Sequence, residues 1–120
     1  MFCLSTIKRM NAPTLAPIAR NRRIKLQGLT SNNTVAYMDE AGSQCVRLHN
    51  TVVARRHPGG QIFLDSGGYL TVTTKRRINE ALRAWGQDWR VYQHKGEWFV
   101  EEVQGAGRGP FEFADGMVLS

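Results

Sequence analysis

The chain has 120 residues, of which 42% are apolar, and a formal net charge of +6, which fits a single domain with one modest core. No stretch approaches the roughly 20 apolar residues of a membrane span, and residues 1–10 lack the apolar run and cleavage site of a secretory signal. Cys3 and Cys45 are too few and too far apart for a disulfide framework, so we expect the protein to act in the reducing environment of the cytoplasm. We expect Cys45 to be a small buried side chain.

The positive charge lies at the N-terminus. Six Lys and Arg precede residue 26 with no acid among them, and the remaining sequence balances ten basic against ten acidic residues. Pro13, Pro17 and weak periodicity predict a flexible basic arm over residues 1–21, followed by one domain over residues 22–120. Such an arm often adds affinity for nucleic acid. It can equally be a solubilising tail or, if Met10 is the natural start, partly an upstream extension.

Alternating runs separated by turn residues predict the first strands. We expect them at residues 22–27, 34–38, 44–49, 51–55 and 61–65, and a β-rich run at 69–73 leads into a helix.

One segment has clear helical periodicity. Its apolar residues fall at i, i+3, i+4 and i+7: Ile78, Ala81, Leu82 and Trp85. This spacing predicts a helix from Lys75 to about Trp85, with Thr73 or Thr74 as N-cap and Gly86 as the glycine that ends it.

Four further strands are expected after the helix, at residues 89–94, 97–103, 111–113 and 117–119. Lys95-Gly96 and Asp115-Gly116 read as tight turns. The pattern predicts an α+β fold of five to eight strands, a mainly antiparallel sheet or partial barrel with one principal helix packed on it. We expect the three tryptophans to be mostly core, although one or two could lie on an open sheet face and stack bases.

Three cations, Lys75, Arg76 and Arg77, follow the predicted N-cap, where the helix dipole favours acidic residues. Free backbone N–H groups beside cations suit a phosphate or carboxylate, although these side chains can equally extend into water. The candidate anion or nucleic-acid site comprises Thr73, Thr74, Lys75, Arg76, Arg77, Arg55, Arg56, Arg22 and Arg23.

Sequence patterns of catalysis are missing. There is no glycine-rich nucleotide fingerprint and no G-x-S-x-G elbow, and Asp65 and Ser66 read as turn residues. His49, His57 and His94 are scattered without metal-ligand spacing. We therefore expect no enzymatic activity, no metal and no cofactor.

Several segments together resemble a family of small tailed-bacteriophage proteins. The similar segments are Leu48–Val53, Ile62–Asn79 with its Gly-Gly-Tyr and Thr-Thr-Lys runs, Trp89–Val100 with Val-Tyr-Gln and Trp-Phe-Val, and Phe113–Met117. Tyr69 stands where tryptophan is more usual in that family. The resemblance spans about Leu48 to Leu119 and implies a phage protein acting in the cytoplasm of an infected bacterium, in a family mostly without assigned function.

Two functions fit these observations. The first is a non-enzymatic phage accessory protein that contacts nucleic acid through the basic helix N-terminus and the basic arm. The second is an anti-defence, anti-CRISPR-like inhibitor that docks on a host protein complex, using Lys75–Arg77 or the acidic segment Glu97–Asp115. Neither involves a membrane, and the oligomeric state is left open.

Overall fold

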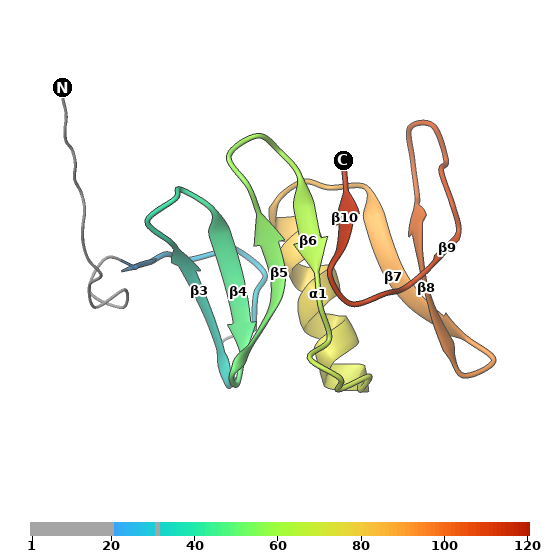
Figure 1. Ribbon diagram of the computed structural model, residues 1–120, viewed down its shortest axis with the longest axis horizontal. Coiled ribbons are helices and arrows are strands. Elements are labelled where there is room, and N and C mark those ends of the chain that lie inside the picture. The colour runs from blue at the N-terminus through green and yellow to red at the C-terminus, as the bar shows by residue number, and fades with distance from the viewer. Residues whose placement is uncertain (1–20, 31) are drawn as a thin grey trace, which may run out of the picture.

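The computed structural model describes residues 21–30 and 32–120. In this part of the chain, nine strands and one helix form two antiparallel sheets and no closed barrel (Figure 1). The α+β prediction is confirmed, but the described strands exceed the expected five to eight and fall into two sheets. The elements are β2 (Arg22–Arg23), β3 (Thr34–Met38), β4 (Gln44–Leu48), β5 (Thr51–Arg56), β6 (Ile62–Leu64), α1 (Val72–Ala84), β7 (Trp89–His94), β8 (Glu97–Glu102), β9 (Phe111–Glu112) and β10 (Met117–Leu119).

The larger sheet has the order β10-β6-β5-β4-β3-β2, and the smaller has the order β7-β8-β9. The C-terminal strand β10 returns to the larger sheet and pairs with β6, Met117 opposite Leu64. The β4–β5 register shifts between Val46 and Arg47, so that Val53 is an extra residue on β5. Both Val53 and the adjacent Ala54 are buried as a result.

Helix α1 begins one turn earlier than the sequence predicts. Its N-cap is Thr71, in extended backbone, and the Thr71 hydroxyl accepts a hydrogen bond from the Thr74 backbone N–H. Thr73 and Thr74, predicted as caps, are already helical, because the β-branched first turn resembles the end of a strand in sequence. The helix ends as predicted: Gly86, at φ 69°, donates to the Arg83 carbonyl and Gln87 donates to the Leu82 carbonyl.

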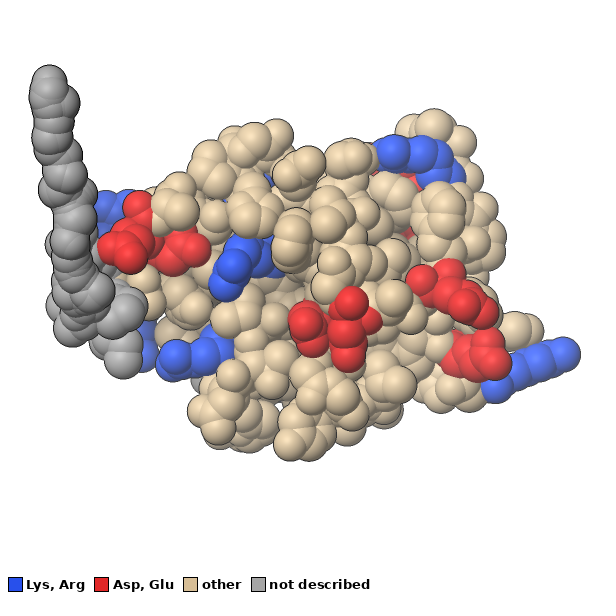
Figure 2. Space-filling view, in the orientation of Figure 1, with Lys and Arg blue, Asp and Glu red and all other residues tan. Residues whose placement is uncertain are grey.

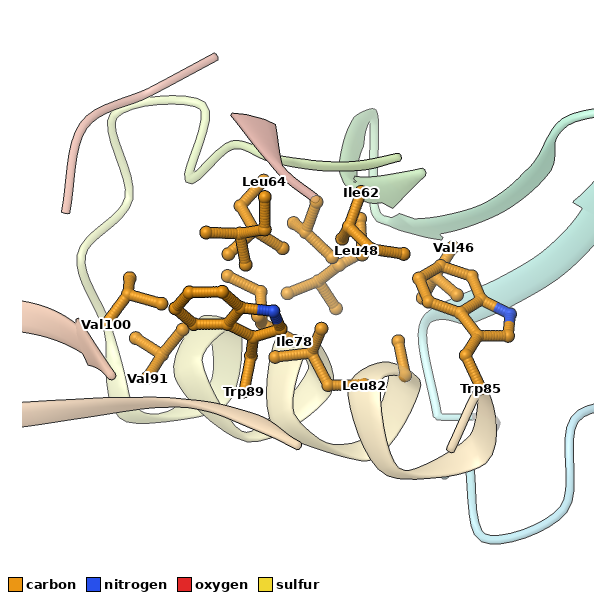
Figure 3. Packing of buried hydrophobic residues seen from close by; sticks show 14 of the residues in the cluster. Val46, Leu48, Ile62, Leu64, Ile78, Leu82, Trp85, Trp89, Val91 and Val100 are labelled. Atoms are coloured by element: carbon orange, nitrogen blue, oxygen red, sulfur yellow. The ribbon is translucent and has the colours of Figure 1, made fainter. Parts of the chain in front are cut away.

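The core lies where α1 meets both sheets (Figure 3). The predicted helical stripe is buried, and Leu82 and Ile78 are fully enclosed. All three tryptophans, Trp85, Trp89 and Trp98, are at least nine-tenths buried, which confirms their role in the core and leaves none of them for base stacking. Because α1 covers only one face of the larger sheet, the opposite face of that sheet turns outward (Figure 1).

Candidate functional site

The three cations at the start of α1 point to three different places, because successive helical residues are about 100° apart. Lys75 is half-buried, with Nζ 3.2 Å from Gln93 Oε1 and over the Trp98 ring. Arg76 is exposed. Arg77 is buried. The structure therefore does not form these cations into one clamp around a phosphate.

Arg77 is held inside the protein, where it is 5% exposed. Its Nε donates to Thr34 Oγ1 at 3.1 Å, and its Nη1 lies 3.5 Å from Glu80 Oε1. Glu80 is bound more closely by Thr30, whose backbone N–H and hydroxyl donate to the carboxylate at 3.1 and 2.9 Å. These contacts fix α1 to β3 and to the segment before it.

A pocket of about 580 Å³ opens beside the start of α1. We call it the polar pocket. Its walls are the turn before β3, the β4–β5 turn, the loop before α1 and the first turn of α1. The lining residues are Asn32, Asn33, Leu48, His49, Asn50, Thr51, Val53, Ser66, Tyr69, Thr71, Thr73, Thr74 and Arg77. Of the predicted site residues, the pocket therefore includes Thr73, Thr74 and Arg77.

The loop that forms one wall of this pocket requires glycine at residue 67. Gly67 has φ 64°, and a Cβ there would lie 2.5 Å from Thr51 Oγ1 and 2.7 Å from Thr51 Cγ2. Its neighbour Ser66 is fixed by Asp115, whose carboxylate accepts from the Ser66 backbone N–H at 2.8 Å and from its hydroxyl at 2.7 Å. The similarity in the Gly-Gly-Tyr and Asp-Gly-Met segments thus has a structural basis.

A second feature is the face of the larger sheet that turns away from α1, which we call the outer face. Side chains alternate along strands, so strand pairing places one row of them across this face. The row comprises Arg23, Tyr37, Cys45, Arg55, Phe63 and Val118.

Aromatic and cationic side chains are neighbours on the outer face. Arg47, beside this row, has its guanidinium carbon 5.9 Å from the centre of the Tyr37 ring. Phe63 packs edge-on against His57, with ring centres 4.8 Å apart, and remains 37% exposed. His57 is thus half-buried.

The middle of the row is tightly packed. Cys45 is fully buried, as expected, and burial raises the pKa of its thiol, with the nearby Arg55 acting in the opposite direction. Burial also raises the pKa of Tyr37, and the neighbouring Cys45 adds to the effect. Both groups are therefore neutral at pH 7.

A hollow of about 390 Å³ lies on the outer face beside Arg55 and Phe63 and reaches the β4–β5 turn at Asn50 and Thr51. Those two turn residues also line the polar pocket, so the two concavities adjoin. The buried Nε of Arg55 has no hydrogen-bond partner within the described ranges. A donor of this kind is unusual in a folded protein.

Charge is divided between the two sheets. The described strands of the larger sheet contain five arginines and no Asp or Glu. Strands β7–β9 contain four glutamates and one arginine. Figure 2 looks onto the outer face, where basic and acidic residues occupy separate small areas among uncharged ones. The acids visible there lie outside the strands of the larger sheet.

Two of the glutamates on the smaller sheet are already paired. Arg90 Nη2 lies 2.7 Å from Glu101, and Arg108 Nη2 lies 3.1 Å from Glu102. Hydrogen bonds from Arg108 lower the pKa of Glu102, although burial acts in the opposite direction. These pairs reduce the charge with which this sheet could imitate a nucleic acid.

The remaining predicted site residues lie on different sides of the larger sheet. Arg55 and Arg23 share the outer row, whereas Arg56, opposite Gln44, turns toward the α1 side, as does Arg22, opposite Met38. Of the predicted basic arm over residues 1–21, residues 1–20 lie outside the described residues. Sequence reasoning missed Tyr37, Arg47 and Phe63, whose only signal was alternation within short strands of unknown register.

Within the described residues no three His, Cys, Asp or Glu side chains are grouped so as to hold a metal ion. No helix there is long and apolar enough to cross a membrane.

Comparison with known proteins gives a family. A family model described as Kyanoviridae Gp96 protein matches residues 7–120. The chain therefore belongs to the Kyanoviridae (cyanophage) Gp96 protein family, which confirms the bacteriophage resemblance. The match begins 41 residues before Leu48, where the resemblance began, and so includes most of the basic arm. No curated protein and no solved structure matches the chain.

Proposed function

We propose that this Kyanoviridae Gp96 protein is a non-enzymatic phage protein that binds single-stranded nucleic acid on the outer face of its larger sheet. The observation that carries the proposal is the outer row, in which Arg23 lies beside Tyr37 and Arg55 lies beside Phe63, with Cys45 between the two pairs. Proteins that bind single strands combine aromatic side chains, on which bases stack, with cations that contact the backbone.

The spacing of the aromatic residues suits separate bases. Tyr37 on β3 and Phe63 on β6 are three strands apart, or about 14 Å, because neighbouring strands lie about 4.8 Å apart. One base cannot contact both rings at that distance. A single-stranded nucleic acid that crosses the sheet would place one base at each ring and its phosphates near Arg47 and Arg55.

The hollow beside Phe63 supports the same placement. It offers a recess for the base that stacks on Phe63, and Arg55 lines it. An acceptor from the ligand can satisfy the buried Arg55 Nε if the side chain shifts, and a charged acceptor gives a stronger hydrogen bond than a neutral one.

The charge distribution also supports this face over the smaller sheet. A nucleic acid on the outer face meets strands without Asp or Glu, with Asp65 as the acid that lines the hollow, whereas strands β7–β9 present four glutamates. Three arginines, Arg23, Arg47 and Arg55, are available to contact phosphates. Base stacking therefore supplies much of the affinity, and the dependence on salt is shallow.

The competing hypothesis, inhibition of a host defence complex, predicts a different binding surface. If the acidic segment acts by imitating nucleic acid, charge reversal at Glu101, Glu102 and Glu112 should abolish inhibition. Under the present proposal the same changes leave single-strand binding intact or stronger, because these residues lie on the other sheet.

Fluorescence anisotropy with labelled oligonucleotides of about 12 nucleotides tests the proposal, since single-strand sites span roughly 4–16 nucleotides per domain. We expect single strands of DNA or RNA to bind more tightly than the matching duplex. Contacts to three phosphates limit the slope of log affinity against log salt to about −2 for the domain without its arm. A preference for duplex, or no binding at about 50 mM salt, would contradict the proposal.

A further inference from the structure

Most of the lining of the polar pocket is not used by the proposed single-strand site, and only Asn50 and Thr51 also line the hollow beside Phe63. Its volume of about 580 Å³ lies within the range of small-molecule sites, roughly 300–1,000 Å³. The described residues that line it include one arginine, Arg77, and no Asp, Glu or Lys. The carboxylate paired with Arg77, that of Glu80, is not part of the lining.

Two polar partners hold the Arg77 side chain at the edge of the pocket. Its bond to Thr34 and its contact with Glu80 engage Nε and Nη1, and the described residues supply no hydrogen bond to Nη2. A guanidinium presents its donors in a rigid fork that suits phosphate oxygens. Because this side chain is 5% exposed, little of its freedom remains to be lost on binding.

Neutral donors surround the same space. The side-chain amides of Asn33 and Asn50 and the hydroxyls of Thr51 and Thr73 belong to the lining. The first turn of α1 adds the positive end of the helix dipole. Leu48 and Val53 give part of the lining an apolar character, and Tyr69 on the lining is 67% exposed, so its ring is available for stacking.

We propose that the polar pocket binds a phosphomonoester attached to an aromatic base, that is, a nucleoside monophosphate, either free or at the end of a nucleic-acid strand. The phosphate lies between Arg77 and the first turn of α1, and the base stacks on Tyr69. The pocket does not depend on the outer face for its ligand, so it goes beyond the proposed function.

Isothermal titration calorimetry with adenosine 5′-monophosphate, adenosine and inorganic phosphate tests this site. We expect the monophosphate to bind about tenfold or more tightly than either part, since charged hydrogen bonds and ring stacking both contribute. If adenosine binds as well as the monophosphate, or none of the three binds, the inference is wrong.

Substitution of Arg77 risks unfolding, so Thr73→Glu is the decisive variant. Thr73 is exposed in the first helical turn, where an acidic residue stabilises a helix, so the variant should fold. Its carboxylate should repel the phosphate and lower affinity about tenfold or more relative to Thr73→Gln, which is similar in size to the glutamate variant, neutral, and equally without the hydroxyl. Equal binding by both variants with a melting curve like that of the wild type would overturn the inference.

Two comparisons identify the source of the ligand and separate this site from the outer face. Phe63→Ala should leave binding of the monophosphate unchanged, and a loss there would contradict an independent pocket. If the ligand is a strand end, an oligonucleotide with a terminal phosphate binds more tightly than one with a terminal hydroxyl, and Thr73→Glu removes the difference. If the ligand is a free nucleotide, the terminal phosphate has no effect and the monophosphate alone is bound.

Discussion

The side-chain amide of Asn79 closes both backbone hydrogen bonds of Val91. Asn79 Nδ2 donates to the Val91 carbonyl, and the Val91 N–H donates to Asn79 Oδ1, each at 2.8 Å. Asn79 thus pairs with β7 as a neighbouring strand would, and it joins α1 to the smaller sheet. Asn79 and Val91 lie in two of the segments that resemble the phage family, so this contact gives a structural reason for the resemblance of those segments.

Replacing Asn79 with alanine should destabilise the protein by about 2–4 kcal/mol, because two backbone groups of a buried residue lose their partner at about 1–3 kcal/mol each. Thermal unfolding followed by circular dichroism measures the change. Arg83→Ala, an exposed change on the same helix, should stay within about 0.5 kcal/mol. An unchanged melting temperature in Asn79→Ala would show that water replaces the amide at no cost.

Leu82→Ala should cost about 2–5 kcal/mol, because Leu82 is fully buried between α1 and the sheets and truncation leaves a cavity. The matched control is Val72→Ala on the same helix, since Val72 is 70% exposed. Denaturant unfolding of both variants gives the difference. Similar midpoints for the two would place the apolar stripe outside the core.

The ion pair between Glu102 and Arg108 should make the stability of the folded protein decrease at acidic pH. Hydrogen bonds from Arg108 hold the pKa of folded Glu102 below its usual 4.5. A carboxyl with a lower pKa in the folded state contributes stability that is complete above the unfolded pKa and is lost as the pH falls through the folded pKa. Glu102→Gln should therefore melt below wild type at pH 7 and approach it at about pH 2. A difference that persists at pH 2 would point to packing instead of charge.

The sequence predicts local structure well and long-range pairing poorly. Strands β3 and β10 and the glycine after α1 occur as expected, because alternation and turn residues act over a few positions. The extra residue at Val53 and the contact between Ser66 and Asp115, 49 residues apart, depend on the completed fold. Four residues with helical periodicity located α1, but its β-branched first turn hid the N-cap.

The candidate sites divide in the same way. Arg55 and Arg77 were predicted as binding residues from their charge. In the structure Arg55 lies on the outer face and Arg77 lines the polar pocket. Phe63 was missed because a three-residue strand does not reveal which face its middle residue takes until β5 and β10 are in place. The sequence could not supply that register.

The basic arm should add phosphate contacts without changing the stacking site. Residues 1–20 contain Lys8, Arg9 and Arg20. Removing them should make the slope of log affinity against log salt shallower by up to about 2, at about 0.7 per phosphate for single strands. Anisotropy across a salt series compares the two forms. An identical slope would show that the arm does not touch the nucleic acid.

The most direct measurement of the central claim compares the single-strand affinities of two variants, each of which lacks one aromatic ring, on the larger or on the smaller sheet. Phe63→Ala removes a 37% exposed ring from the outer face, and Phe111→Ala removes a 47% exposed ring from the smaller sheet. Because stacking on one ring contributes about 1–3 kcal/mol, Phe63→Ala should weaken binding about 5- to 150-fold, and Phe111→Ala should leave it within about twofold. Equal affinities for the two variants, or a loss only in Phe111→Ala, would contradict binding on the outer face.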